Sequence, residues 1–262
     1  MTIRLSPGFA TAYLERGSAF DEKGDYRRAI ADYDAAIRLD PRCEGAYNNR
    51  AVTYEKIGEH ALAVADYGRA LRLTPDRAET FVNRGLALCA MGDCGRAIAD
   101  FDQAVRILPE FADAYCNRGL AHLQKGDPEY AVADIKRAID IAPNYIAAYL
   151  NRGIALCTLC DYDQGIADFN KVLELAPNNA MAYIDRSHTL CILGEYDRAI
   201  LDFGRAIEIE PDNATALHNR GNAYYWKRRL LPCHFRLRPS HPAQIGLRPS
   251  PLEPGQCLRR SW

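Results

Sequence analysis

An all-α fold, a solenoid of stacked helical hairpins, is predicted by three observations: prolines recur at a fixed spacing, aromatic and small residues recur with them, and a glycine followed by an acid divides each unit. The prolines stand 34 residues apart without insertion or deletion, at Pro7, Pro41, Pro75, Pro109, Pro143, Pro177 and Pro211. A unit of this length cannot bury its own apolar face and must stack on copies of itself.

The first half of each 34-residue row, counted from Ala10, has the pattern of an amphipathic helix. A mostly aromatic column is followed four residues later by a small residue and three residues later again by a mostly large one. These steps place the columns on one helical stripe, with the small residue where a neighbouring helix comes close. The aromatic column is Tyr13, Tyr47, Phe81, Tyr115, Tyr149, Tyr183 and Leu217, the small column is Gly17, Ala51, Gly85, Gly119, Gly153, Ser187 and Gly221, and the third column is Phe20, Tyr54, Leu88, His122, Leu156, Leu190 and Tyr224.

The second half of each row predicts another helix, in which a small residue precedes a large one by four positions. Between the halves stands a glycine in five rows and a cysteine in one, and an acid follows it: the residues are Gly24, Gly58, Gly92, Gly126, Cys160 and Gly194. Glycine ends a helix because it adopts the left-handed conformation easily, and an acid suits the start of the next helix. Each row is therefore a helical hairpin.

This succession of aromatic, glycine, alanine, aromatic and proline resembles the tetratricopeptide (TPR) repeat. The resemblance covers residues 10–226, as six full repeats and the first helix of a seventh. It implies a right-handed superhelix whose first helices line the concave face, and it implies binding without catalysis. One column departs from the family, which usually has leucine where every row here has arginine: Arg16, Arg50, Arg84, Arg118, Arg152, Arg186 and Arg220.

The two ends differ from the repeats. Residues 1–9 match the end of a row, as the remnant of an upstream repeat, and residues 227–262 are predicted to be a basic, Pro/Arg-rich disordered tail. The abrupt loss of register suggests a shifted reading frame or a truncated array. The alternative is a docking segment, because residues 251–254 read Pro-Leu-Glu-Pro.

The composition is typical of a soluble helical protein, with 48% hydrophobic residues, 26% charged residues and a formal net charge of −1. Residues 227–262 hold eight Lys or Arg residues and one acid, which leaves 25 basic and 33 acidic residues in the rest. An acidic repeat region argues against nucleic-acid binding. Because no apolar run reaches a membrane span or forms a signal peptide, we expect a cytoplasmic protein without a membrane partner.

The nine cysteines do not form a disulfide framework, and they are scattered through the predicted helices. Cys157 and Cys160 have the spacing of a redox or zinc motif, but no second pair and no histidines stand at ligand spacing. We therefore expect semi-buried thiols, with no metal and no cofactor.

The arginine column is matched by an acid in every second helix: Asp32, Asp66, Asp100, Asp134, Asp168 and Asp202. A planar guanidinium suits bidentate, half-buried pairing better than lysine. This predicts ion pairs within or between hairpins, so that Arg118 has Asp100 and Asp134 as candidate partners.

The residue before each arginine forms a largely amide column that lies about 200° round the helix from the aromatic column, because it comes two residues later. The column is Glu15, Asn49, Asn83, Asn117, Asn151, Asp185 and Asn219. One amide can hold both the N–H and the C=O of an extended peptide. The column resembles the asparagines that line the TPR superhelix of O-linked N-acetylglucosamine transferases. The alternative is that these side chains bond to neighbouring helices or water.

Apolar residues are predicted to flank the asparagines in a peptide-binding groove, among them Val82, Leu86, Leu120 and Ile154. The lysines with which TPR domains clamp the carboxylate tails of chaperones are missing from the neighbouring columns. The sequence thus predicts a non-catalytic scaffold that binds a peptide or helix of a protein partner. The alternatives are the substrate-recruiting arm of a glycosyltransferase or other enzyme, and an array that self-associates through uncovered ends.

Overall fold

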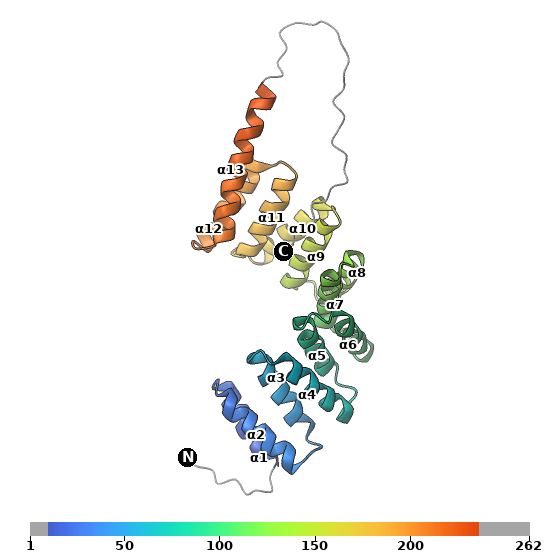
Figure 1. The fold of residues 1–262 in the computed structure, drawn as a ribbon. Coiled ribbons are helices and arrows are strands. Elements are labelled where there is room, and N and C mark those ends of the chain that lie inside the picture. Colours follow the sequence, from blue (N-terminus) through green and yellow to red (C-terminus); the bar gives the residue numbers. More distant parts are fainter. Residues whose placement is uncertain (1–9, 236–262) are drawn as a thin grey trace, which may run out of the picture.

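The computed structural model describes residues 10–235, with side chains to residue 229. It confirms an all-α solenoid: thirteen helices follow one another in these residues, and no strand occurs among them. They stack into an elongated body with α1 and α13 at opposite ends (Figure 1). The helices are α1 (Ala10–Glu22), α2 (Tyr26–Leu39), α3 (Glu44–Lys56), α4 (His60–Leu73), α5 (Ala78–Ala90), α6 (Cys94–Ile107), α7 (Ala112–Lys125), α8 (Pro128–Ile141), α9 (Ile146–Thr158), α10 (Tyr162–Leu175), α11 (Ala180–Ile192), α12 (Tyr196–Ile209) and α13 (Ala214–Phe235).

The turn inside each hairpin has the conformation that the sequence predicts. All five glycines at this place have a positive φ, between 75° and 91°, and Cys160 takes the same conformation with φ 62°. The acid that follows caps the second helix in three hairpins, where Asp25, Asp93 and Asp161 accept a hydrogen bond from a backbone N–H of the first turn.

Each hairpin packs a large side chain of its second helix against the small residue of its first. A Cβ added to Gly85 would lie 2.6 Å from the ring of Phe101, and one added to Gly153 would lie 2.6 Å from the ring of Phe169. The side chains that fill these notches are among the most buried of the described residues: Tyr33, Tyr67, Phe101, Ile135, Phe169 and Phe203. The small column is therefore required by packing rather than by backbone conformation.

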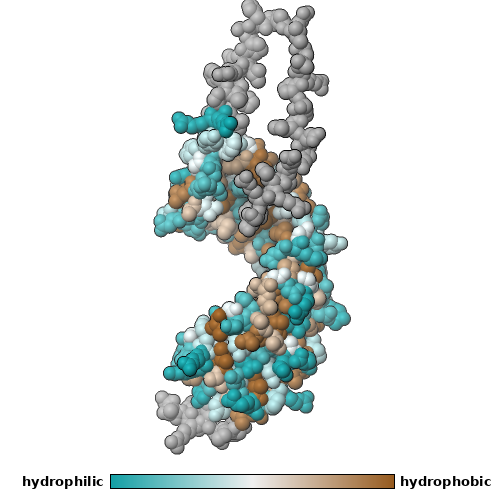
Figure 2. Space-filling model, in the orientation of Figure 1, coloured by the Kyte–Doolittle hydropathy of each residue, from teal (hydrophilic) through white to brown (hydrophobic). Residues whose placement is uncertain are grey.

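The odd-numbered helices line the inner side of the solenoid. Each odd-numbered helix contacts the next odd-numbered one, whereas no two even-numbered helices contact each other in the described part of the chain. Helices on the inside of a curved stack lie closer together than those on the outside. Figure 2 shows the molecule hollowed on one side midway along its length.

The last helix is longer than the repeat pattern predicts. We expected a helix that ends at Trp226 and a disordered tail from residue 227, but α13 continues to Phe235. The first five added residues, 227–231, are Lys, Arg and Leu, which are good helix formers, and α13 also includes Pro232, which local propensity does not explain. The remaining predictions for the two ends, at residues 1–9 and 236–262, lie outside the described residues.

Candidate peptide-binding groove

The predicted ion pairs form within every complete hairpin. In each, the arginine of the first helix donates from Nε and Nη2 to the two carboxylate oxygens of the aspartate 16 residues later, over distances of 2.5–2.8 Å. We call this set the arginine–aspartate ladder. Its pairs are Arg16–Asp32, Arg50–Asp66, Arg84–Asp100, Arg118–Asp134, Arg152–Asp168 and Arg186–Asp202.

Every second arginine also reaches the preceding hairpin. Arg118 donates from Nη1 to Asp102 at 2.6 Å, Arg186 donates to Asn170 at 2.6 Å, and Arg50 pairs with Asp34. The corresponding residues before Arg84 and Arg152 are Gly68 and Lys136, which offer no acceptor. Of the two partners considered for Arg118, Asp134 is therefore right and Asp100 is wrong, because Asp100 pairs with Arg84.

The guanidinium groups are held by rings as well as by charges. Arg118 lies over the ring of Tyr115, with 5.3 Å between the guanidinium carbon and the ring centroid, and the other five ladder arginines lie over the corresponding ring. The hydrogen bonds to Asp134 raise the pKa of Arg118 against the opposing effect of burial. The ladder is thus a permanently charged element of the packing between helices.

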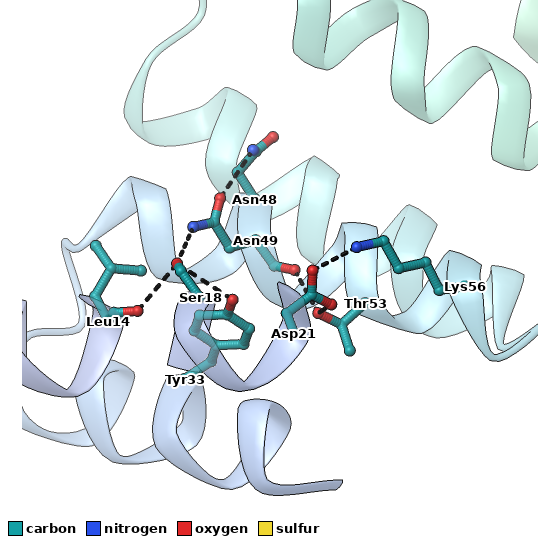
Figure 3. A network of polar contacts seen from close by, with 8 residues as sticks. All are labelled: Leu14, Ser18, Asp21, Tyr33, Asn48, Asn49, Thr53 and Lys56. Carbon is teal, nitrogen blue, oxygen red and sulfur yellow. Dashed lines mark hydrogen bonds and ion pairs between the residues drawn. The ribbon is translucent and has the colours of Figure 1, made fainter. Parts of the chain in front are cut away.

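The amide column lies on the same helices, and its first complete rung is closed by bonds inside the protein (Figure 3). Asn49 on α3 donates from Nδ2 to the hydroxyl of Ser18 on α1 at 3.2 Å, and it accepts a weak bond from Asn48 at 3.4 Å. Further along, Asp21 of α1 accepts a hydrogen bond from Thr53 at 2.8 Å and pairs with Lys56. At this rung the amide joins two neighbouring helices.

The next two rungs are open. The side-chain amides of Asn83 and Asn117 form no hydrogen bond with any described residue, and neither has a polar atom fully shielded from solvent. Asn219 is open in the same way. Asn151 donates only to the thiol of Cys116, at 3.7 Å. The column therefore offers two adjacent open amides, on α5 and α7, and a third that is weakly engaged on α9.

Asp185 occupies the same column on α11 and differs in charge. Its Oδ2 is buried and has no hydrogen-bond partner among the described residues. Burial raises the pKa of this carboxyl group to about 6. Once protonated, the group can both donate and accept a hydrogen bond, as an amide can, although it has one donor hydrogen where an amide has two.

The residues predicted to flank the amides separate into two sets. Val82 is 5% exposed and lies in the core with Leu88 and Phe101, so little of it is open to a partner. Leu86 is 42% exposed and Leu120 and Ile154 are half-buried, on the turn that follows each amide. The open amides are thus bordered by a row of accessible aliphatic side chains.

A shallow pocket of about 340 Å³ lies at the α11–α13 end of the groove, and sequence reasoning missed it. It is lined by His188, Cys191, Ile192, Tyr196 and Trp226. His188 lies three residues after Asp185, as Leu86 does after Asn83, and Ile192 lies seven after it. This spacing on one helix face was the available signal, but the contribution of α13 depends on tertiary packing.

The described residues give little support for a metal site, a reactive thiol or a membrane span. Among residues 10–235 no three His, Cys, Asp or Glu side chains are grouped so that they could hold a metal ion. The thiols of Cys89, Cys116, Cys157 and Cys191 have pKa values raised by burial, which disfavours the reactive thiolate. None of the thirteen described helices is both long and apolar enough to cross a membrane.

Known protein families match most of the repeat region. Family models described as "Tetratricopeptide repeat" match residues 14–78, 112–145, 146–179 and 169–200, and one described as "TPR repeat" matches residues 85–126 and 188–227. Among curated proteins, none matches the sequence significantly.

Several solved structures have a similar fold. The MamA protein is 27% identical, with a TM-score of 0.60 and coverage of 65% of this chain and 93% of that one. A repeat protein from Parabacteroides merdae is 21% identical, with a TM-score of 0.73 and coverage of 87% and 91%. YrrB, described as "a TPR protein with an unusual peptide-binding site", is 24% identical, with a TM-score of 0.58 and coverage of 72% and 97%. The last two likenesses concern the fold alone.

Proposed function

The chain belongs to the tetratricopeptide repeat family, and on that premise we propose that it is a non-catalytic scaffold whose groove binds an extended apolar segment of a partner protein. The observation that carries the proposal is the pair of open amides, Asn83 and Asn117, beside the accessible side chains of Leu86 and Leu120. Amides would hold the partner's backbone, and the aliphatic row would contact its side chains.

The spacing of the amides suits an extended chain. Neighbouring packed helices lie about 8–10 Å apart, and an extended peptide advances about 3.3 Å per residue. One amide therefore meets the backbone at roughly every third peptide residue. The side chains between these contacts are free to point at the aliphatic row.

Charge adds a preference for basic residues in the partner. Glu79 and Asp113 are exposed and lie four residues before Asn83 and Asn117, one helical turn away on the same side. Neither carboxylate has an ion-pair partner among the described residues, although Asp113 also interacts with the hydroxyl of Tyr145. We therefore expect a bound segment to carry a Lys or Arg beside its apolar residues.

The end pocket suits an anchoring side chain. Ile192 and Trp226 are about half exposed although they line a hollow, so that an aliphatic or aromatic residue placed there would bury apolar surface on both sides. The groove would thus bind the backbone of the peptide in its middle and one apolar side chain of the peptide at its α13 end.

The test is a peptide-display selection on the full chain, followed by affinity measurements with Asn83→Ala/Asn117→Ala. If the amides hold backbone, the double variant binds several unrelated selected peptides about 30-fold more weakly, because each lost hydrogen bond costs about 1 kcal/mol. Asn178→Ala, in an exposed loop, is the matched control.

Leu120→Ser separates backbone contacts from side-chain contacts. It should change which peptides are preferred, whereas the double asparagine variant should weaken all of them by similar factors. Equal binding by the double variant and the parent protein would exclude the amides from recognition and refute this use of the groove.

A further inference from the structure

The last helix carries a packing stripe that no described residue covers. In α13 the stripe consists of Leu217, Arg220, Gly221 and Tyr224, at the positions where the six complete hairpins place an aromatic residue, the ladder arginine, the small residue and a large residue. In the complete hairpins this stripe packs against the second helix. In α13, Leu217 is 42% exposed and Tyr224 is 50% exposed.

The third hairpin defines what such a stripe accepts. There Arg84 pairs with Asp100, the notch at Gly85 holds the ring of Phe101, and Leu88 is 1% exposed. In α13 the notch at Gly221 is empty, because no described residue lies within 4 Å of a Cβ built there. Arg220 has no ion-pair partner in the described part of the chain, and the residue 16 positions later is an arginine.

We propose that this stripe is a second binding site, separate from the groove, for a helix of a partner protein that carries an aspartate directly before an aromatic residue. Most of the six hairpins share the rest of the recognised pattern; the fourth has Ile135 in place of the aromatic residue, and the fifth has Val172 in place of the second small residue. A small residue stands three positions before the aspartate and another three positions after the large residue, as in Ala97, Asp100, Phe101 and Ala104, all of which are buried. The partner helix pairs its carboxylate with Arg220 and places its ring on Gly221.

Charge argues for a different protein rather than a second copy. Arg228 and Arg229 lie exposed further along α13, so two α13 helices facing each other would bring like charges together. The second helices of a folded copy are engaged, because all six of their aspartates already make bidentate pairs. Residues 236–262 of this chain contain no aspartate.

The probe is a fluorescent peptide with the sequence of residues 194–212, which contains Asp202, Phe203 and the natural caps of α12. We expect saturable binding to the full chain by fluorescence anisotropy. Gly221→Leu, which fills the notch, and Arg220→Asp should each weaken binding at least tenfold. Asp202→Arg in the peptide should restore binding to Arg220→Asp.

Folding is controlled by circular dichroism and by Gly95→Leu, which fills another glycine position with no neighbour within 4 Å and should leave binding unchanged. The proposal is overturned if the peptide does not bind, or if neither substitution in α13 weakens its binding. It is also overturned if peptide binding requires removal of residues 236–262, which would make the tail the occupant. Sedimentation that shows a dimer abolished by Gly221→Leu would make the occupant a second copy.

Discussion

Each odd-numbered helix has an arginine face and an amide face, and the two differ in how their side chains are bonded although neighbouring residues form them. An asparagine directly precedes four of the six ladder arginines, as in Asn117 and Arg118, and the two side chains have opposite surroundings. Arg118 is held by two carboxylates and a ring, whereas the amide of Asn117 is open. The arginine column has the same partner in all six hairpins, and the amide column changes its partner from rung to rung. The uniformly bonded arginines build the fold, and we propose that the amides without a partner among the described residues are the ones that bind another protein.

The largest difference between the two faces should appear in stability. Arg118→Ala leaves Asp134 and Asp102 without their cation, and we expect a loss of about 2 kcal/mol, below the usual cost of breaking a fully buried pair because this pair is partly exposed. Asn117→Ala should change stability by less than about 0.5 kcal/mol, as surface substitutions do. Urea denaturation followed by circular dichroism compares the two variants.

Because repeats unfold as coupled neighbours, hydrogen exchange of the backbone amides in α7 and α8 provides a second, local measure of stability. If neither Arg118→Ala nor Asn117→Ala changes stability, the arginine–aspartate ladder does not stabilise the fold. If Asn117→Ala lowers the free energy of unfolding more than Arg118→Ala does, the amide face is the one that stabilises the fold.

A smaller effect should come from Asp185, where the amide column carries a buried acid. Its pKa is raised to about 6, so the folded protein retains a proton that the unfolded chain has already released between about pH 4 and 6. Stability should therefore fall as pH rises through this window and then level off. Asp185→Asn should stabilise the protein by about 1–2 kcal/mol at pH 8, after allowance for partial solvent access, and by less at pH 5.

Thermal denaturation at the two pH values measures this difference, with Asp163→Asn as the control at an exposed site. A gain that is equal at pH 5 and pH 8 would mean that the carboxyl group keeps its ordinary pKa and that its burial has no electrostatic cost.

Much of the fold was predictable because every requirement recurs at a fixed interval. The positive φ at Gly24 follows from a glycine between two helices, and Cys160 takes the same conformation because it stands at the same place in the repeat. The Arg118–Asp134 pair follows from two columns in constant register. Six copies of the same requirement act as an internal alignment. Where the columns allow two partners, as for Arg118, the packing of the helices selects one of them.

Features that recur every second row, or only once, escaped this reasoning. The bond from Arg118 to Asp102 has no equivalent at Arg84, because Gly68 stands at that place, so its column is not uniform. The burial of Val82 depends on how closely successive hairpins approach, which a single helix pattern does not specify. The extension of α13 lies beyond the repeat pattern and includes Pro232, so neither the pattern nor local propensity predicts where this helix ends.

The most direct measurement is a ¹H–¹⁵N spectrum of side-chain signals of the full chain, recorded during titration with the tightest peptide from the display selection. We expect the amide signals of Asn83 and Asn117 to shift to saturation, while the Nε–H signals of Arg84 and Arg118 stay in place because their aspartates hold them. Shifts confined to the arginine signals, or amide signals that stay unchanged at saturating peptide, would contradict the assignment of one face to the fold and the other to binding.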